Sequence, residues 1–163
     1  KNKRRARVNV YLKKYPKAEF FQNRKPWEIP CDIALPCATQ NELAEKDADL
    51  LIKNNCRCVG EGANMPSSPK AINRFAMHKI LYAPGKASNA GGVAVSGLEM
   101  AQNSLRYNWT RQEVDDKLKS IMGDIHQSCL YYGKEKNYVN YVKGANIAGF
   151  VKVADAMLAQ GVV

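Results

Sequence analysis

Residues 31–62 read CDIALPCATQNELAEKDADLLIKNNCRCVGEG, and this stretch alternates two kinds of pattern. Two short apolar runs, Ile33–Leu35 and Cys56–Val59, enclose a segment whose apolar residues recur at helical spacing. Pro36 ends the first run, and a glycine-rich turn follows the second. The pattern predicts a strand, a helix over residues 42–55 and a second strand.

The same plan repeats downstream. Ser67 or Ser68 can cap a second helix, and a third apolar run follows at Ile80–Ala83. Strands and helices that alternate at such short spacing predict an α/β fold with a parallel sheet and flanking crossover helices.

The remainder is predicted to be mostly helical. We expect a helix over residues 3–15, a short strand over 18–21, and a C-terminal helical segment from residue 109 onward. Thr110 and Glu113 have the spacing of a capping box. The last helix, residues 142–161, is predicted to point these residues inward: Ile147, Phe150, Ala154, and Met157 or Leu158.

Right-handed crossovers place the carboxyl ends of all three strands along one edge of the sheet. The loops expected there read PCATQNE (36–42), GEGANMP (60–66) and APGKASNAGG (83–92). They carry small residues and uncharged polar side chains, and this edge is where open parallel sheets bind ligands. Glu61 also lies there, and a hydrogen bond to the turn backbone is its predicted role.

Gly91 and Gly92 stand at the head of a predicted helix that has Asn89 at or near its N-cap. Glycines there would let a ligand approach the free backbone N–H groups. Val93 and Ser96 would share one face of this helix with Asn89. Alternatively, the glycines allow close helix–strand packing and Ser96 bonds back to its own helix. The opposite face is predicted to be core, and it carries Ala94, Leu98, Ala101 and Leu105.

The net charge of +10 raises the alternative of a basic α/β nucleic-acid-binding module. Residues 1–30 hold ten Lys/Arg and two Asp/Glu, so the excess is concentrated in one terminal segment, and we expect a solvated face and no nucleic acid. Five cysteines without a secretion signal indicate reduced thiols, and their spacing predicts no metal site. No apolar run approaches the roughly 20 residues that span a bilayer.

Four blocks of the sequence resemble the C-terminal region of hexameric glutamate dehydrogenases, closest to the bacterial type that commonly uses NADP. The blocks are DIALPCATQNEL, EGANMP, PGKASNAGGVAVSGLEMAQN and NYVKGANIAGFVKVADAMLAQGV. The resemblance implies a Rossmann-like cofactor domain in a cytoplasmic homo-hexamer. It also implies reversible deamination of L-glutamate to 2-oxoglutarate and ammonium with NADP, NAD not being excluded.

Carried over by motif, the resemblance places Ala38, Thr39, Asn64 and Asn89 at the cofactor. It places Val93 and Ser96 in the glutamate pocket, with the Ser96 hydroxyl on the distal carboxylate.

The family's catalytic Lys and Asp, and its glycine fingerprint, have no counterpart in these residues. We therefore expect a fragment without catalytic residues and without turnover of its own. Residues 1–108 would form the second half of the dinucleotide-binding domain, a partial Rossmann-like sheet. Residues 109–163 would form C-terminal helices that pack on it and, in the full enzyme, towards the substrate domain.

Overall fold

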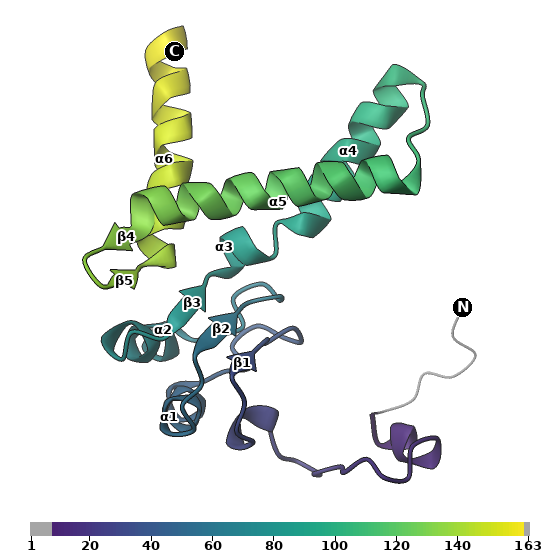
Figure 1. The fold of residues 1–163 in the computed structure, drawn as a ribbon, viewed down its shortest axis with the longest axis vertical. Helices are drawn as coiled ribbons and strands as arrows, with labels where there is room; N and C mark the ends of the chain where they lie inside the picture. The colour runs from purple at the N-terminus through teal and green to yellow at the C-terminus, as the bar shows by residue number, and fades with distance from the viewer. Residues whose placement is uncertain (1–7, 162–163) are drawn as a thin grey trace.

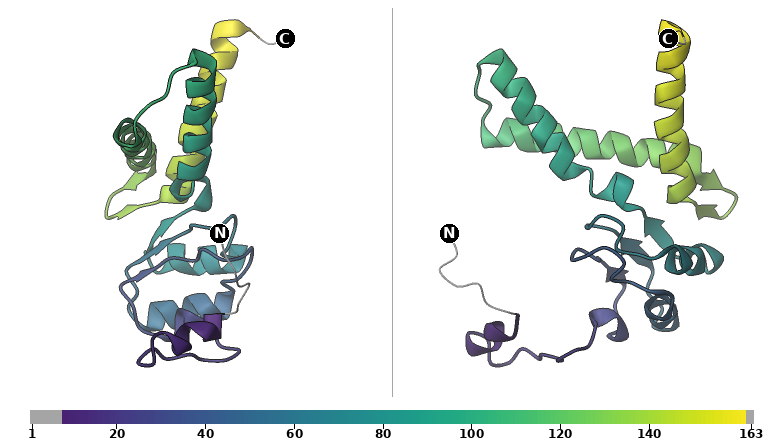
Figure 2. Two further views of the ribbon diagram at one scale, coloured as in Figure 1. Left: turned by 90° about the vertical axis from the view of Figure 1, so that its right-hand side faces the viewer. Right: turned by 180° about the vertical axis from the view of Figure 1, so that it is seen from behind.

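The computed structural model describes residues 8–161, and its ribbon is drawn in Figures 1 and 2. Two short 3-10 helices, Val8–Lys13 and Pro26–Glu28, precede the first strand. The remaining elements, in chain order, are β1 (Ile33–Ala34), α1 (Glu45–Lys53), β2 (Cys58–Gly60), α2 (Pro69–Met77), β3 (Leu81–Ala83), α3 (Gly85–Ser88), α4 (Gly91–Leu105), α5 (Arg111–Gly133), β4 (Lys134–Glu135), β5 (Tyr138–Val139) and α6 (Tyr141–Gln160).

The first three strands form a parallel sheet in the order β1-β2-β3, as predicted. Val59 lies on the central strand, where it pairs with Ala34 of β1 on one side and with Tyr82 of β3 on the other. Because α1 joins β1 to β2 and α2 joins β2 to β3, each connection is a helical crossover, which parallel neighbours require. The α/β fold class is therefore confirmed.

The hydrophobic core lies between this sheet and helices α1 and α2. Leu51 and Phe75 are fully buried on the two helices, and the Phe75 ring stacks on Tyr82 with centroids 5.7 Å apart. Leu43 is also fully buried, although it lies before α1, because its bridge to Ser67 holds it against the sheet. Ser68 caps α2 by accepting a hydrogen bond from the Ala71 N–H, with Pro69 in the first turn.

Helices α4, α5 and α6 extend away from the sheet (Figure 1). The predicted capping box starts α5, since Thr110 Oγ1 accepts from the Glu113 N–H and Glu113 accepts from the Thr110 N–H. α5 packs closely on α6, where Gly144 is buried against the backbone of Cys129. Gly161 ends α6 with φ +83°, as its C-cap position predicts.

Four predictions about local structure are wrong in whole or in part. The N-terminal helix appears as a 3-10 helix over Val8–Lys13, with residues 3–7 outside the described chain, and residues 18–21 form no strand. No residue of α4 is buried, so the face predicted as core lies largely open, with Leu105 65% exposed. On α6, Ile147 and Ala154 are half-buried as predicted, whereas Phe150, Met157 and Leu158 are 72%, 51% and 84% exposed.

The reason is that helical periodicity identifies an apolar face without saying what covers it. α4 contacts α5 along only part of its length, and the outer turns of α6 project past α5 (Figure 2). Within residues 8–161, no helix combines the length and the apolar character that crossing a membrane requires.

Candidate functional site

The three strand–helix junctions converge on one crevice of about 530 Å³ at the carboxyl edge of the sheet. The first junction contributes its backbone turn after β1, the second the loop after β2, and the third the start of α4. The lining residues are Cys37, Ala38, Gln40, Gly62, Ala63, Asn64, Asn89, Gly92 and Val93. This convergence is what the sequence predicted for an open parallel sheet.

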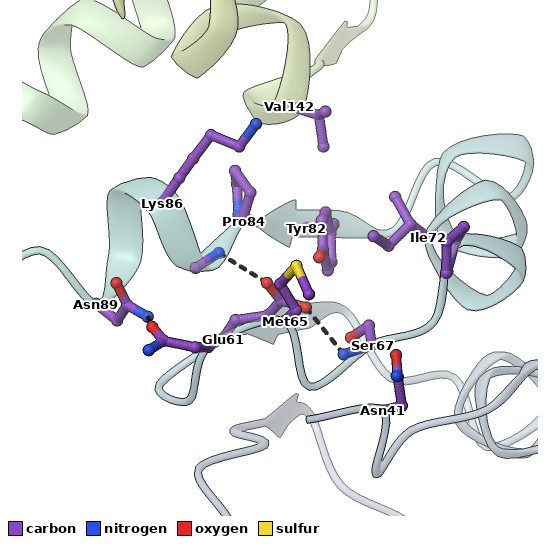
Figure 3. A pocket seen from close by; sticks show the side chains of 13 residues that line it. Asn41, Glu61, Met65, Ser67, Ile72, Tyr82, Pro84, Lys86, Asn89 and Val142 are labelled. Carbon is purple, nitrogen blue, oxygen red and sulfur yellow. Dashed lines mark hydrogen bonds between the residues drawn. The ribbon is translucent and has the colours of Figure 1, made fainter. Parts of the chain in front are cut away.

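A buried carboxylate holds two of these junctions together. Glu61 is 4% exposed; its Oε1 accepts from the Ser67 N–H at 3.1 Å and its Oε2 from the Gly85 N–H at 2.7 Å (Figure 3). The Ser88 hydroxyl donates in turn to the Glu61 carbonyl at 2.6 Å. The predicted role of Glu61, hydrogen bonding to turn backbone, is confirmed, and it fixes the loop after β2 against the loop after β3.

Two asparagines form the contact between those loops. Asn89 Nδ2 donates to Asn64 Oδ1 at 2.9 Å and to the Ala63 carbonyl at 3.1 Å. Asn89 immediately precedes Ala90, the N-cap of α4, and is itself the C-cap of the short helix α3. It therefore sits at a helix junction near the N-cap, as predicted, with its amide tied to the neighbouring loop.

The glycine pair at the head of α4 does not serve close packing within the described residues. A Cβ on Gly92 would meet no atom within 4 Å, and one on Gly91 would make only ordinary contacts, at 3.8 Å, with Leu118 and Met122. Among the glycines that line the crevice, packing restricts Gly62, because a Cβ there would overlap the Cys37 sulfur. Gly92 thus leaves the first turn of α4 open towards the crevice, and the packing explanation of the pair is wrong here.

Four of the six predicted site residues line the crevice, namely Ala38, Asn64, Asn89 and Val93. Thr39 is exposed in the turn after β1, where its carbonyl accepts from the Glu42 N–H, and Ser96 is exposed one turn further along α4. Neither of these two is among the lining residues.

The sequence reasoning missed Cys37, Gly62 and Ala63 as lining residues. Gly62 and Ala63 could have been found from their place beside Asn64 in the GEGAN turn. Cys37 could likewise have been found from its place beside Ala38 in the PCATQNE loop, although its contact with Gly62 could not.

The chemistry of the crevice is uncharged. Its polar side chains are the amides of Gln40, Asn64 and Asn89 and the thiol of Cys37, and its lining includes no Asp, Glu, Lys, Arg or His. Amides both donate and accept, which suits a carboxamide or a sugar hydroxyl. Within residues 8–161, no three His, Cys, Asp or Glu side chains gather where they could hold a metal ion.

Comparison with known proteins identifies the family. Residues 1–161 match the Glutamate/Leucine/Phenylalanine/Valine dehydrogenase family. The chain belongs to this family. The resemblance seen in the sequence blocks is thereby confirmed, and these comparisons give no support to the nucleic-acid-binding alternative.

Individual relatives of this dehydrogenase family agree. The chain is 59% identical to the glutamate dehydrogenase of Bacteroides thetaiotaomicron, covering 100% of this chain and 37% of the relative. It is 58% identical to the NAD(P)-specific glutamate dehydrogenase of Xylanibacter ruminicola, covering 99% of this chain and 36% of that protein. Among solved structures, the glutamate dehydrogenase of Plasmodium falciparum superposes with a TM-score of 0.93 at 51% identity, covering 97% of this chain and 34% of that one. The chain thus spans little more than a third of the length of these relatives.

Proposed function

We propose that this chain is the second half of the cofactor domain, with the C-terminal helices, of a glutamate dehydrogenase. The complete enzyme would convert L-glutamate, water and oxidised NADP reversibly to 2-oxoglutarate, ammonium, NADPH and a proton, with NAD not excluded as the cofactor. The observation that carries the proposal is the convergence of three strand–helix junctions on one uncharged crevice, in a chain of this family.

The crevice fits a nicotinamide cofactor. Open space beside Gly92 exposes the first turn of α4, and the Asn64 and Asn89 amides can bond a ribose hydroxyl or a carboxamide. When bound, the nicotinamide would accept the hydride from glutamate. The roles proposed for this chain are to bind and orient that cofactor through Ala38, Thr39, Asn64 and Asn89.

The two residues proposed to bind glutamate lie on α4, after its glycine pair. Val93 would wall the aliphatic part of glutamate, and the Ser96 hydroxyl would donate to its distal carboxylate. Both residues are exposed, Val93 to 77%, so both are available to a ligand that enters from the crevice side.

The division of the chain at residues 108 and 109, the cytoplasmic location and the homo-hexameric state belong to the same proposal. The open apolar faces of α4 and α6 support only the part of the proposal that places further protein against these helices, because exposed apolar patches usually mark interaction surfaces.

The first test concerns turnover. The full-length protein is expected to reduce NADP in the presence of glutamate, followed by absorbance at 340 nm, which is where reduced nicotinamide absorbs. Residues 1–163 alone are expected to show no turnover, because the proposed catalytic Lys and Asp lie outside them. Hydride transfer by the isolated chain would overturn the assignment of the catalytic groups, and its absence in the full-length protein would overturn the proposed activity.

The second test concerns Ser96. The Ser96→Ala variant of the full-length protein is expected to raise KM for glutamate about tenfold. A tenfold change corresponds to about 1.4 kcal/mol, near the lower end of what a hydrogen bond to a charged group contributes. KM for the cofactor and the thermal unfolding midpoint are expected to stay unchanged, since the side chain is exposed. Ser104→Ala, which alters another exposed serine of α4, is the matched control. An unchanged KM for glutamate would remove Ser96 from the substrate pocket.

A further inference from the structure

Two cysteines stand side by side just before the first two strands, at the opposite end of the sheet from the crevice. The register of β1 on β2 pairs Ile33 with Cys58, and two residues back along both segments the same register sets Cys31 beside Cys56. Neighbouring strands lie about 4.7–4.9 Å apart, and a disulfide needs Cα atoms about 4.4–6.8 Å apart. The spacing of the two segments therefore suits a covalent link between these cysteines.

The contacts around Cys56 keep the two segments paired up to this point. The carbonyl of Asp32, the residue after Cys31, accepts from the Arg57 N–H at 2.9 Å. Cys56 Sγ lies 3.6 Å from the same carbonyl oxygen, so the thiol points across to the segment that carries Cys31. Cys31 in turn packs against the hydrophobic core cluster of which Cys56 is a member. Backbone pairing and side-chain packing thus both bring the two cysteines together.

The two thiols differ in their access to solvent. Both are free in this structure, but Cys56 is 1% exposed whereas Cys31 is half-buried. Burial is the largest cause of a raised pKa at the Cys56 thiol, and the neighbouring Cys31 thiol adds to the rise. A small oxidant in solution would therefore meet Cys31 first. An accessible thiol next to a second one is the arrangement that reversible thiol oxidation requires.

We propose that Cys31 and Cys56 form a reversible intrachain disulfide when the protein meets hydrogen peroxide. The Cys31 thiolate attacks one peroxide oxygen, the O–O bond breaks, and the departing hydroxide takes up the thiol proton as water. The Cys56 sulfur then attacks the sulfenic acid at Cys31, the S–O bond breaks, and hydroxide leaves with the Cys56 proton as a second water. The sulfurs lose two electrons and two protons in all, and the peroxide is reduced to two waters.

The link would join the two ends of the segment that contains all of β1 and α1. A cross-link of this kind restricts the unfolded chain, so we expect the oxidised protein to unfold at a higher temperature than the reduced protein. The site does not depend on the proposed dehydrogenase activity, because it uses neither the crevice nor α4.

The test is peptide mapping of the full-length protein after treatment with hydrogen peroxide. Remaining thiols are alkylated, and the protein is digested with trypsin without reduction. Trypsin cuts after Arg57 and so separates Cys56 from Cys58, and the expected product joins the peptide 54–57 to the peptide 25–46.

Fragmentation of the linked product assigns the bond. The longer peptide carries both Cys31 and Cys37, so cleavage between these two residues shows which of them is linked. We expect more than half of the recovered Cys56 to be joined to Cys31, and dithiothreitol to release it.

Three variants check the assignment. Cys31→Ser and Cys56→Ala are each expected to abolish the linked product and the rise in unfolding temperature on oxidation. Cys58→Ser is the matched control and is expected to retain both, because Cys58 has Ile33 and Leu81 as its register partners.

Two results would overturn the proposal: recovery of Cys56 mainly as the free thiol after oxidation, or its linkage to a cysteine other than Cys31. If Cys56→Ala fails to fold, Cys31→Ser decides alone, because Cys31 is only half-buried and serine keeps nearly the same volume.

Discussion

Gly144→Ala is expected to destabilise the packing of α5 on α6 by about 3 kcal/mol, near the upper end for an overpacked site. A Cβ at Gly144 would overlap the Cys129 carbonyl oxygen and lie 2.9 Å from its carbonyl carbon. The obstacle is backbone of a long helix, which cannot rotate aside as a side chain does. The two helices would have to separate at the point where they lie closest.

The measurement is amide hydrogen exchange in α5 and α6 of the full-length protein, which reports local free energies of opening. Gly149→Ala is the matched control on the same helix, because a Cβ there meets no atom within 4 Å. It is expected to stabilise α6 by about 1 kcal/mol, the difference in helix propensity between glycine and alanine. Equal protection of the α5 and α6 amides from exchange in the Gly144→Ala and Gly149→Ala variants would show that the close approach at Gly144 does not hold these two helices together.

Substitutions of Glu61 are expected to have the second large effect, on the geometry of the crevice and on cofactor binding. In Glu61→Ala the Ser67 and Gly85 N–H groups lose their acceptor in a buried place, at a cost of about 3 kcal/mol for the pair. Glu61→Gln keeps one oxygen but turns an NH₂ group towards a backbone donor. Because Asn64 and Asn89 lie on the loops that this carboxylate holds, we expect the glutamine variant to raise KM for the cofactor about tenfold, with a smaller change in KM for glutamate.

Steady-state kinetics of the full-length protein, with both substrates varied, separate the two effects. Glu99→Gln, an exposed acid on α4, is the control for loss of one negative charge. If Glu61→Gln lowers stability while KM for the cofactor stays within twofold, the carboxylate supports the fold without positioning the crevice.

The sheet could be predicted from the sequence because its signals are local. Pro36, Ser68 with Pro69, and the short apolar runs each carry information about their own few residues, and the strands appear within one or two residues of the expected bounds. The shared edge of the three junctions then follows from the parallel direction of the strands, which helical crossovers at short spacing predict.

Other features could not be predicted, because they depend on contacts between distant segments. The apolar spacing of Leu98 or Phe150 is the same whether a partner covers the helix or not. The cavity that Ser67 and Tyr82 line arises only when β3 and the turn before α2 enclose a common space. Thr39 and Ser96 remain predictions, since the crevice lining includes neither.

The uncovered faces of α4 and α6 have a practical consequence for anyone who handles this chain in isolation. Dyes such as ANS fluoresce on exposed apolar surface, and their signal is usually taken as a sign of loosened packing. Here Val93, Phe150 and Leu158 offer that surface in the fully folded chain. Bright staining of residues 1–163 would therefore be a property of their native fold.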